Sequence, residues 1–496
     1  MTAHPSYDQL SAAFLRMYRF EHLQAIAMWD HATYIPPGGN DARSAAMGEL
    51  AAHLHRLRTA PELAPLLASA ATEALDELAR ANLREMQRVH RHATALPDAL
   101  VHEATIAGAR CEHAWRTQRP ANDWAGFAVN LKEVVRLTRR QAELLSDQLG
   151  LSKYDALMDR FEPGMRSAEV DRLFGAVKSW LPELIRKVRA RQAKQTVIAA
   201  NGPFPLAAQK ALCERVMKLL QFDFDGGRLD VSTHPFTGGV PEDVRLTTRY
   251  SADQFENSLM GTIHETGHAR YEQHRPRAWL GQPVSEARSM AIHEIQSLSF
   301  EMQLGRSRAF MQLLAPLLRE YLGAQPAFEP DNVFGLYTRV RPGFIRVDAD
   351  EVTYPAHVIL RYEIERLLIE GECEVDDIPA LWDEQMMKLL EVDTRGNYKD
   401  GPMQDIHWTD GAYGYFPCYT LGAMYAAQWF ATIRTQRAAL DSEIARGELS
   451  GVLDWLQANI WENASRFETD ELTRRASGGP LDPAHFKAHL EARYLG

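Results

Sequence analysis

The chain has 496 residues, of which 45% are hydrophobic and 24% charged, values typical of a soluble globular protein with a large core. Its formal net charge of -11 argues against nucleic acid or an anionic membrane surface as the main partner, because both require a basic surface. We expect neither a transmembrane helix nor a secretory signal, since no long apolar stretch occurs and the first residues lack a basic segment followed by an apolar one. The 4 cysteines lack paired spacing, which favours free thiols and a cytoplasmic protein.

Helical periodicity dominates the first 220 or so residues. Apolar residues recur at spacings of three and four over about 7–29, and this pattern stops at the proline- and glycine-rich segment 35–39. The same pattern predicts further helices at about 42–57, 63–94, 97–116, 123–150, 167–195 and 204–221.

Strand signals are sparse, and the best two occupy about 228–232 and 244–250. They flank the glycine- and proline-rich segment 237–241, so we expect a small β-hairpin. Helices resume at about 252–274, 284–306 and past 308, and the segment 401–419 is predicted to be a loop that enters a helix. We therefore expect one mainly α-helical domain over 1–496 with two lobes and a cleft, in which about 1–200 form one wall and about 201–496 the catalytic part.

The segment His264-Glu265-Thr266-Gly267-His268 carries the strongest chemical signal. Side chains four residues apart share one face of a helix, so His264 and His268 can bind one zinc ion. Glu265 lies beside the first ligand and can take a proton from the water that attacks a peptide carbonyl, then pass it to the departing amine. The pattern indicates a zinc peptidase with Glu265 as the general base. The alternative is an exposed helix with incidental histidines.

A catalytic zinc site needs a third protein ligand and an open position. Glu286 and Glu294 on the next predicted helix are the candidates, and spacing alone does not choose between them because they lie two turns apart. Glu294 belongs to a polar cluster in an otherwise apolar stretch, and a buried carboxylate needs a partner, which favours Glu294. The alternative is a solvated pair of glutamates with the third ligand elsewhere.

Six segments resemble, in order and spacing, the motifs of the M32 metallocarboxypeptidases, the carboxypeptidase Taq family. They are residues 234–236 (HPF), 243–247 (DxRxT), 264–268 (the zinc helix), 293–296 (HES/GQ, with Glu294 in the third-ligand place), 345–350 (IRxxAD) and 401–408 (GxxQDxHW). Trp29-Asp30 and Pro36-Pro37 resemble the family's opening helices, so the resemblance covers nearly the whole chain. Ile295 departs from the pattern, because the family usually has Ser or Gly there.

The resemblance implies a mostly helical fold with a deep cleft, similar to neurolysin and angiotensin-converting enzyme. It also implies a homodimer that releases single residues from peptides with a free C-terminus, with Zn²⁺ as cofactor. Co²⁺ can substitute, because nitrogen and oxygen ligands do not exclude it. One rival is an endo-acting zinc oligopeptidase, and another is a non-catalytic helical binding protein with a vestigial zinc site.

An arginine is the natural group to bind a free C-terminal carboxylate, because its guanidinium pairs with both oxygens and is always charged. Arg346, in the IRxxAD-like segment, is the leading candidate, and Arg245 and Arg341 are weaker ones. The alternative is a structural ion pair of Arg346 with Asp348 or Asp350.

Tyr413, Tyr415, Tyr419 and His407 share one glycine-containing segment. A phenol or imidazole there can donate a hydrogen bond to a developing oxyanion, whereas the alternative is ordinary aromatic packing. We expect Tyr415 and His407 to act in catalysis and Tyr419 to bind substrate. His234, which precedes a proline, is a further candidate to line the cleft, or else a buried histidine bonded to backbone.

Overall fold

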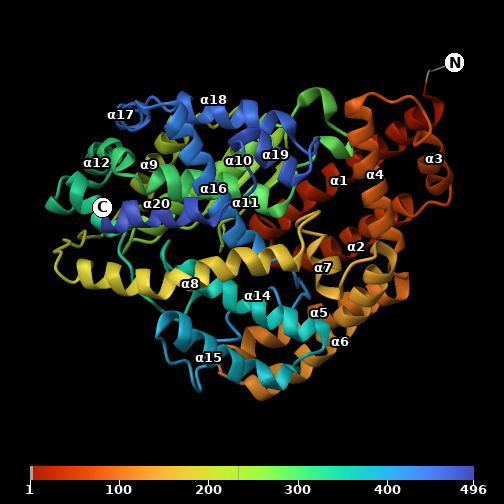
Figure 1. Ribbon diagram of the computed structural model, residues 1–496, viewed down its shortest axis with the longest axis horizontal. Coiled ribbons are helices and arrows are strands. Elements are labelled where there is room, and N and C mark those ends of the chain that lie inside the picture. The colour runs from red at the N-terminus through yellow and green to blue at the C-terminus, as the bar shows by residue number, and fades with distance from the viewer. Residues whose placement is uncertain (1–3, 233) are drawn as a thin grey trace.

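The computed structural model describes residues 4–232 and 234–496, and helices dominate it from end to end (Figure 1). The expectation of a mainly α-helical fold is confirmed. The helices before the sheet are α1 (Pro5–Thr33), α2 (Asn40–Arg58), α3 (Leu63–Ala70), α4 (Glu77–Thr94), α5 (Asp98–Gln118), α6 (Trp124–Leu149), α7 (Lys153–Met158), α8 (Ser167–Gln192) and α9 (Leu206–Leu219).

The helices after the sheet include the two that carry the predicted metal ligands. They are α10 (Glu256–His274), α11 (Met290–Leu298), α12 (Arg308–Leu322), α13 (Pro330–Tyr337), α14 (Tyr354–Glu370), α15 (Ile378–Leu390), α16 (Pro417–Gln436), α17 (Leu440–Ala445), α18 (Ser450–Asn459), α19 (Thr469–Ser477) and α20 (Pro483–Leu495). A π-helix, Ser299–Gly305, follows α11 directly.

Two predicted helices are interrupted in the structure. The predicted helix 63–94 is divided into α3 and α4, because Asp76 caps a new helix by accepting a hydrogen bond from the Ala79 amide. The predicted helix 284–306 begins only at Met290, where Ser289 caps α11 by accepting from the Ile292 amide. Side-chain caps at Asp76 and Ser289 therefore set where α4 and α11 begin.

The small sheet has three strands, β1 (Gly227–Val231), β2 (Thr237–Val240) and β3 (Asp243–Thr248), in the order β1-β3-β2. The expected pairing of 228–232 with 244–250 as a hairpin is wrong, because β1 and β3 are parallel and the hairpin joins β2 to β3. The segment predicted as a turn forms β2 because glycine tolerates its backbone: Gly239 has φ 93°, and a Cβ there would lie 2.1 Å from the Asp243 carbonyl oxygen.

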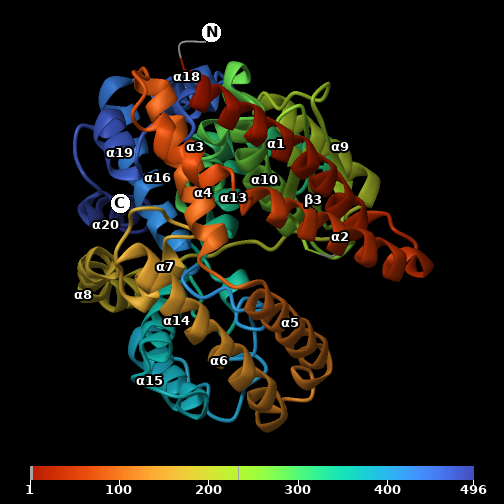
Figure 2. The same ribbon diagram turned by 90° about the vertical axis from the view of Figure 1, so that its right-hand side faces the viewer.

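The buried apolar side chains form two clusters. The smaller one packs α1 to α4 together and runs from Leu10 to Met86, and the larger one runs from Ala107 to Tyr494. In both views α5, α6, α14 and α15 lie below α10 and α16, and Figure 2 shows α1 at the level of α10. The boundary between the two clusters lies between Met86 and Ala107. The predicted division into a cleft wall (about 1–200) and a catalytic part (about 201–496) stays a prediction.

All four cysteines are free thiols, and three of them are buried. None of the helices within 4–232 and 234–496 combines the length and apolarity that crossing a membrane requires.

Candidate metal centre

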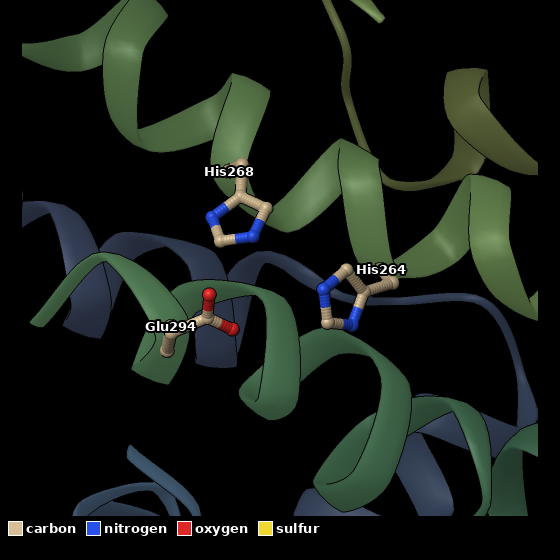
Figure 3. A group of neighbouring side chains, drawn as sticks. All are labelled: His264, His268 and Glu294. Atoms are coloured by element: carbon tan, nitrogen blue, oxygen red, sulfur yellow. The ribbon is translucent and has the colours of Figure 1, made fainter. Parts of the chain in front are cut away.

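The predicted ligands come together where α10 crosses α11. Figure 3 shows both imidazoles projecting from α10 toward the carboxylate of Glu294 on α11. The ligand atoms of His264, His268 and Glu294 all lie within 4.8 Å of one another. The alternative ligand Glu286 instead forms an ion pair with Arg275 at 3.0 Å.

Gly267 allows the two helices to approach this closely. A Cβ on Gly267 would lie 2.4 Å from the Gln296 carbonyl oxygen and 2.7 Å from the Ser297 Cα, both backbone atoms of α11. Gly422 on α16 plays a similar part on the other side, where a Cβ would lie 3.0 Å from the Glu294 Cβ. The position of Glu294 therefore depends on two glycines that sequence reasoning did not single out.

The three side chains fit a divalent cation. Glu294 is 7% exposed, and its one hydrogen-bond donor is the Ser297 hydroxyl at 3.4 Å, so within the described residues this buried carboxylate has no ion-pair partner. Burial raises the pKa of Glu294 above its usual value, and burial lowers the pKa of His268 well below 6.5. A neutral imidazole and an unpaired buried carboxylate are the groups that a cation would engage.

Glu301 and Arg306 orient His264 from behind. The His264 Nδ1 lies 2.9 Å from a Glu301 carboxylate oxygen, and Arg306 donates to the other oxygen at 2.5 Å. Burial by itself would lower the pKa of His264, but the hydrogen bond to Glu301 and the nearby Glu265 raise it to about 9. With Nδ1 donating to Glu301, Nε2 is left to face the ligand cluster. Glu301 belongs to the π-helix, a geometry that is frequent at functional sites.

A second chain of contacts orients His268. Its Nδ1 lies 2.6 Å from the His293 Nδ1, and the His293 Nε2 lies 2.8 Å from Glu272. Glu272 in turn forms an ion pair with Arg275 at 2.8 Å. Because a carboxylate only accepts, His293 donates from Nε2 and accepts at Nδ1, so His268 donates from Nδ1 and keeps Nε2 free.

The C-terminal helix α20 supports the π-helix. Arg493 donates to the carbonyl oxygens of Met302 and of Gln303, the latter at 3.2 Å. Arg493 also pairs at 2.9 Å with Glu351, which is fully buried and accepts from the Tyr494 hydroxyl at 2.9 Å. The π-helix that carries Glu301, the hydrogen-bond partner of His264, is thus bound by Arg493 in the last turn of α20.

The predicted general base is fixed by the sheet. The Thr237 hydroxyl on β2 donates to the Glu265 carboxylate at 2.7 Å. Burial raises the pKa of Glu265, while the neighbouring His264 and the Thr237 hydroxyl act in the opposite direction. Glu265 is therefore held at the edge of the ligand cluster rather than in it.

Arg346 is buried, and its charge acts on the Glu294 carboxylate. Its Nε and Nη2 donate to Asp405 at 3.0 and 2.8 Å, and its Nη1 donates to the Tyr354 hydroxyl at 2.7 Å. The alternative of an ion pair with Asp348 or Asp350 is not what forms: Arg346 pairs with Asp405, and Asp350 accepts from backbone amides including that of Arg341. A guanidinium has five N–H groups, so two remain for a ligand.

The aromatic residues of 407–419 are divided between the site and the core. Tyr415 packs against Tyr419 with ring centroids 5.2 Å apart, and the Tyr419 hydroxyl lies 3.2 Å from the His407 Nε2. Burial lowers the pKa of His407 to about 4, so the ring is neutral at pH 7. Tyr413 is fully buried and stacks on Trp408 at 6.3 Å, which removes it from the candidates for the oxyanion.

The remaining candidates lie at the edge of the site or away from it. His234 is exposed between β1 and β2, which excludes the buried alternative, and a Cβ on Gly261 of α10 would lie 3.8 Å from the neighbouring Pro235 side chain. Arg245 forms an ion pair with Asp243, to which its Nε donates at 2.8 Å. Arg341 lines an outer groove beside Arg339.

The comparisons with known proteins agree over the whole chain. Residues 9–494 match the carboxypeptidase Taq (M32) metallopeptidase family. The chain is 37% identical to thermostable carboxypeptidase 1 of Thermus thermophilus, over 100% of this chain and 99% of that protein. Its fold matches metallocarboxypeptidase 1 of Trypanosoma cruzi (TM-score 0.98, 46% identity, 99% and 100% of the two chains) and a carboxypeptidase of Pyrococcus furiosus (TM-score 0.93, 32% identity, 99% of each). The chain therefore belongs to the carboxypeptidase Taq (M32) family and is a metal-dependent carboxypeptidase.

Proposed function

We propose that Zn²⁺, bound by His264, His268 and Glu294, is the metal of this carboxypeptidase and that Co²⁺ can replace it. Two imidazoles and one carboxylate suit either ion and leave a position open. When bound, the ion supplies an acidified water and polarises the carbonyl of the scissile bond. The single observation that carries the proposal is the convergence of these three side chains, each oriented from behind by its own packing or hydrogen bonds.

Glu265 acts as the general base. It takes a proton from the attacking water and delivers it to the departing amine, and the Thr237 hydroxyl keeps its carboxylate in one orientation. Tyr415 and His407 are proposed as donors to the oxyanion, since both lie in the group of rings beside Glu294 and Arg346.

Arg346 anchors the C-terminal carboxylate of the substrate. Its two uncommitted N–H groups and the Tyr419 ring, 4.9 Å from the guanidinium, border the site. A buried arginine whose charge acts on the ligand Glu294 favours cleavage of the last peptide bond over internal cleavage. His234 is proposed to contact the substrate from the sheet side.

Two experiments test this function. A mass-spectrometric time course on a free-ended peptide and its C-terminally amidated twin, with and without chelator, should show a ladder that shortens from the C-terminus of the free peptide alone. Cleavage of the amidated peptide would favour the endo-acting alternative. Glu265→Gln should keep its metal and lose turnover by about 10³-fold, and full activity in that variant would end the proposed role of Glu265.

We also infer a homodimer in the cytoplasm. The homodimer rests on family membership and the location on the unpaired cysteines. Sedimentation velocity of the purified chain tests the first, and fractionation of the source cells tests the second.

A further inference from the structure

A row of aromatic rings joins Arg346 to a second arginine, Arg160. The Arg346 guanidinium lies 4.9 Å from the Tyr419 ring, and Tyr419 lies 5.2 Å from Tyr415. Tyr415 meets Phe161 at 5.2 Å, and the Arg160 guanidinium lies 5.6 Å from the Phe161 ring. The two arginines are thus the ends of one row, with Tyr415 between them.

The row gives the substrate a direction, an argument that rests on the proposed function. If the terminal carboxylate binds Arg346 and the scissile carbonyl lies near Tyr415, the upstream residues continue toward Phe161 and Arg160. The steps of 5.2 and 5.6 Å place the Arg160 guanidinium within about 11 Å of the Tyr415 ring. An extended peptide advances about 3.3 Å per residue, so Arg160 is within reach of the second or third residue upstream of the bond.

Arg160 also lines a cavity of about 520 Å³. Met17 of α1, Arg58 of α2, Arg88 of α4 and Leu145 of α6 contribute to its walls. Glu286 lines the same cavity, and its ion pair with Arg275 begins the chain of contacts that ends at His268. Two separate series of residue contacts, the aromatic row and the ion pairs that begin at Glu286, therefore connect this cavity to the metal centre.

Most charges in the cavity are already neutralised. Glu21 pairs with Arg58 at 2.5 Å, and Glu286 pairs with Arg275 at 3.0 Å. Arg88 lies 3.9 Å from Asp159 and donates to its carbonyl oxygen at 2.7 Å. Arg160 is exposed, and within the described part of the chain no carboxylate lies at ion-pair distance from it. Arg160 is therefore a cation of the cavity that has no ion-pair partner among the described residues.

We propose that Arg160 and this cavity form a subsite for acidic side chains of the substrate, two or three residues upstream of the bond that is cut. A carboxylate there would gain a charged partner without displacing an existing ion pair. A lysine there would face Arg160 with no free carboxylate, because Glu21 and Glu286 are both occupied.

The test compares acetylated, free-ended alanine peptides that carry Glu, Gln or Lys at the second or third residue upstream of the last peptide bond. We expect kcat/KM for release of the terminal alanine to be about fivefold to tenfold higher with Glu than with Lys at low ionic strength, with Gln between them. Arg160→Gln should remove the order and Arg160→Glu should reverse it. Arg474→Gln on α19, which removes an exposed arginine paired with Asp470, should keep the order.

The outcomes separate the subsite from the activity. A wild-type preference for Lys, or an order that persists in Arg160→Gln, would overturn the subsite while leaving the carboxypeptidase mechanism intact. If even the Gln peptide released no alanine in the presence of zinc, the proposed mechanism would fail and the subsite with it. Loss of the order at high salt in the wild type would support a charge interaction.

Discussion

Replacing Gly267 with alanine tests how closely α10 and α11 must pack for the metal centre to form. The added Cβ would lie 2.4 Å from the Gln296 carbonyl oxygen and 2.7 Å from the Ser297 Cα. Both are backbone atoms, so α11 would have to move by about 1 Å to restore ordinary contact. Such overpacking costs about 1–3 kcal/mol, partly offset by the gain of about 1 kcal/mol when alanine replaces glycine inside a helix. We therefore expect a loss of up to about 2 kcal/mol in the free energy of unfolding.

The effect on metal binding should be larger than the effect on stability. Glu294 lies on the same helix two residues before Gln296, and metal–ligand distances tolerate only about 0.2 Å of error, so zinc affinity should fall at least about 100-fold. Gly261→Ala is the matched control on α10, since among the described residues its Cβ would meet only the Pro235 side chain, at 3.8 Å. Chelator competition and thermal unfolding of both variants would measure the difference. Equal zinc affinity in the two variants would refute the argument.

Three further predictions concern the surroundings of the ligands. Thr237→Val should lower kcat about 10- to 100-fold at unchanged KM and metal content, whereas Thr237→Ser should retain most activity. Equal losses of kcat in the two variants would contradict the proposal that the Thr237 hydroxyl orients Glu265. Arg493→Lys should weaken zinc binding about tenfold in chelator competition, against an unchanged Arg474→Gln control. Burial raises the pKa of Glu365 to about 7, despite hydrogen bonds from Gly414, Trp408 and Tyr154. A raised pKa in the folded state means that the stability contributed by Glu365 is complete below about pH 4.3 and lost by about pH 7. The Tm of the wild type, measured relative to that of Glu365→Gln, should therefore fall between these two pH values. A Tm difference that stays constant with pH would exclude the raised pKa of Glu365.

The convergence of the three predicted ligands could be anticipated because their signals are local. His264 and His268 share a helical face through their spacing, and the polar cluster around Glu294 stands out within an apolar stretch. Segment 401–419 was also predicted correctly as a loop that enters a helix, since α16 begins at Pro417. In each case neighbouring residues carry the information.

The partners of these residues were not predictable, because they are distant in sequence. Arg346 pairs with Asp405, 59 residues away, although Asp348 and Asp350 are much nearer along the chain. Thr237 reaches Glu265 across 28 residues, and Glu301 reaches His264 across 37. The parallel pairing of β1 with β3 was missed for a related reason, because β2 lies between them in sequence but at the edge of the sheet.

The distribution of these contacts predicts that the metal centre depends on segments far from the ligands in sequence. The predicted ligands lie within 31 residues of one another, from 264 to 294, but the groups that support them and Glu265 extend from Thr237 on β2 to Arg493 on α20. A helix–helix fragment with the same ligands would leave Glu301 without Arg493 behind its π-helix and Glu265 without Thr237. Metal affinity generally depends on such outer contacts as well as on the ligands, so we expect the last helix of the chain to contribute to metal binding although none of its residues belongs to the ligand cluster.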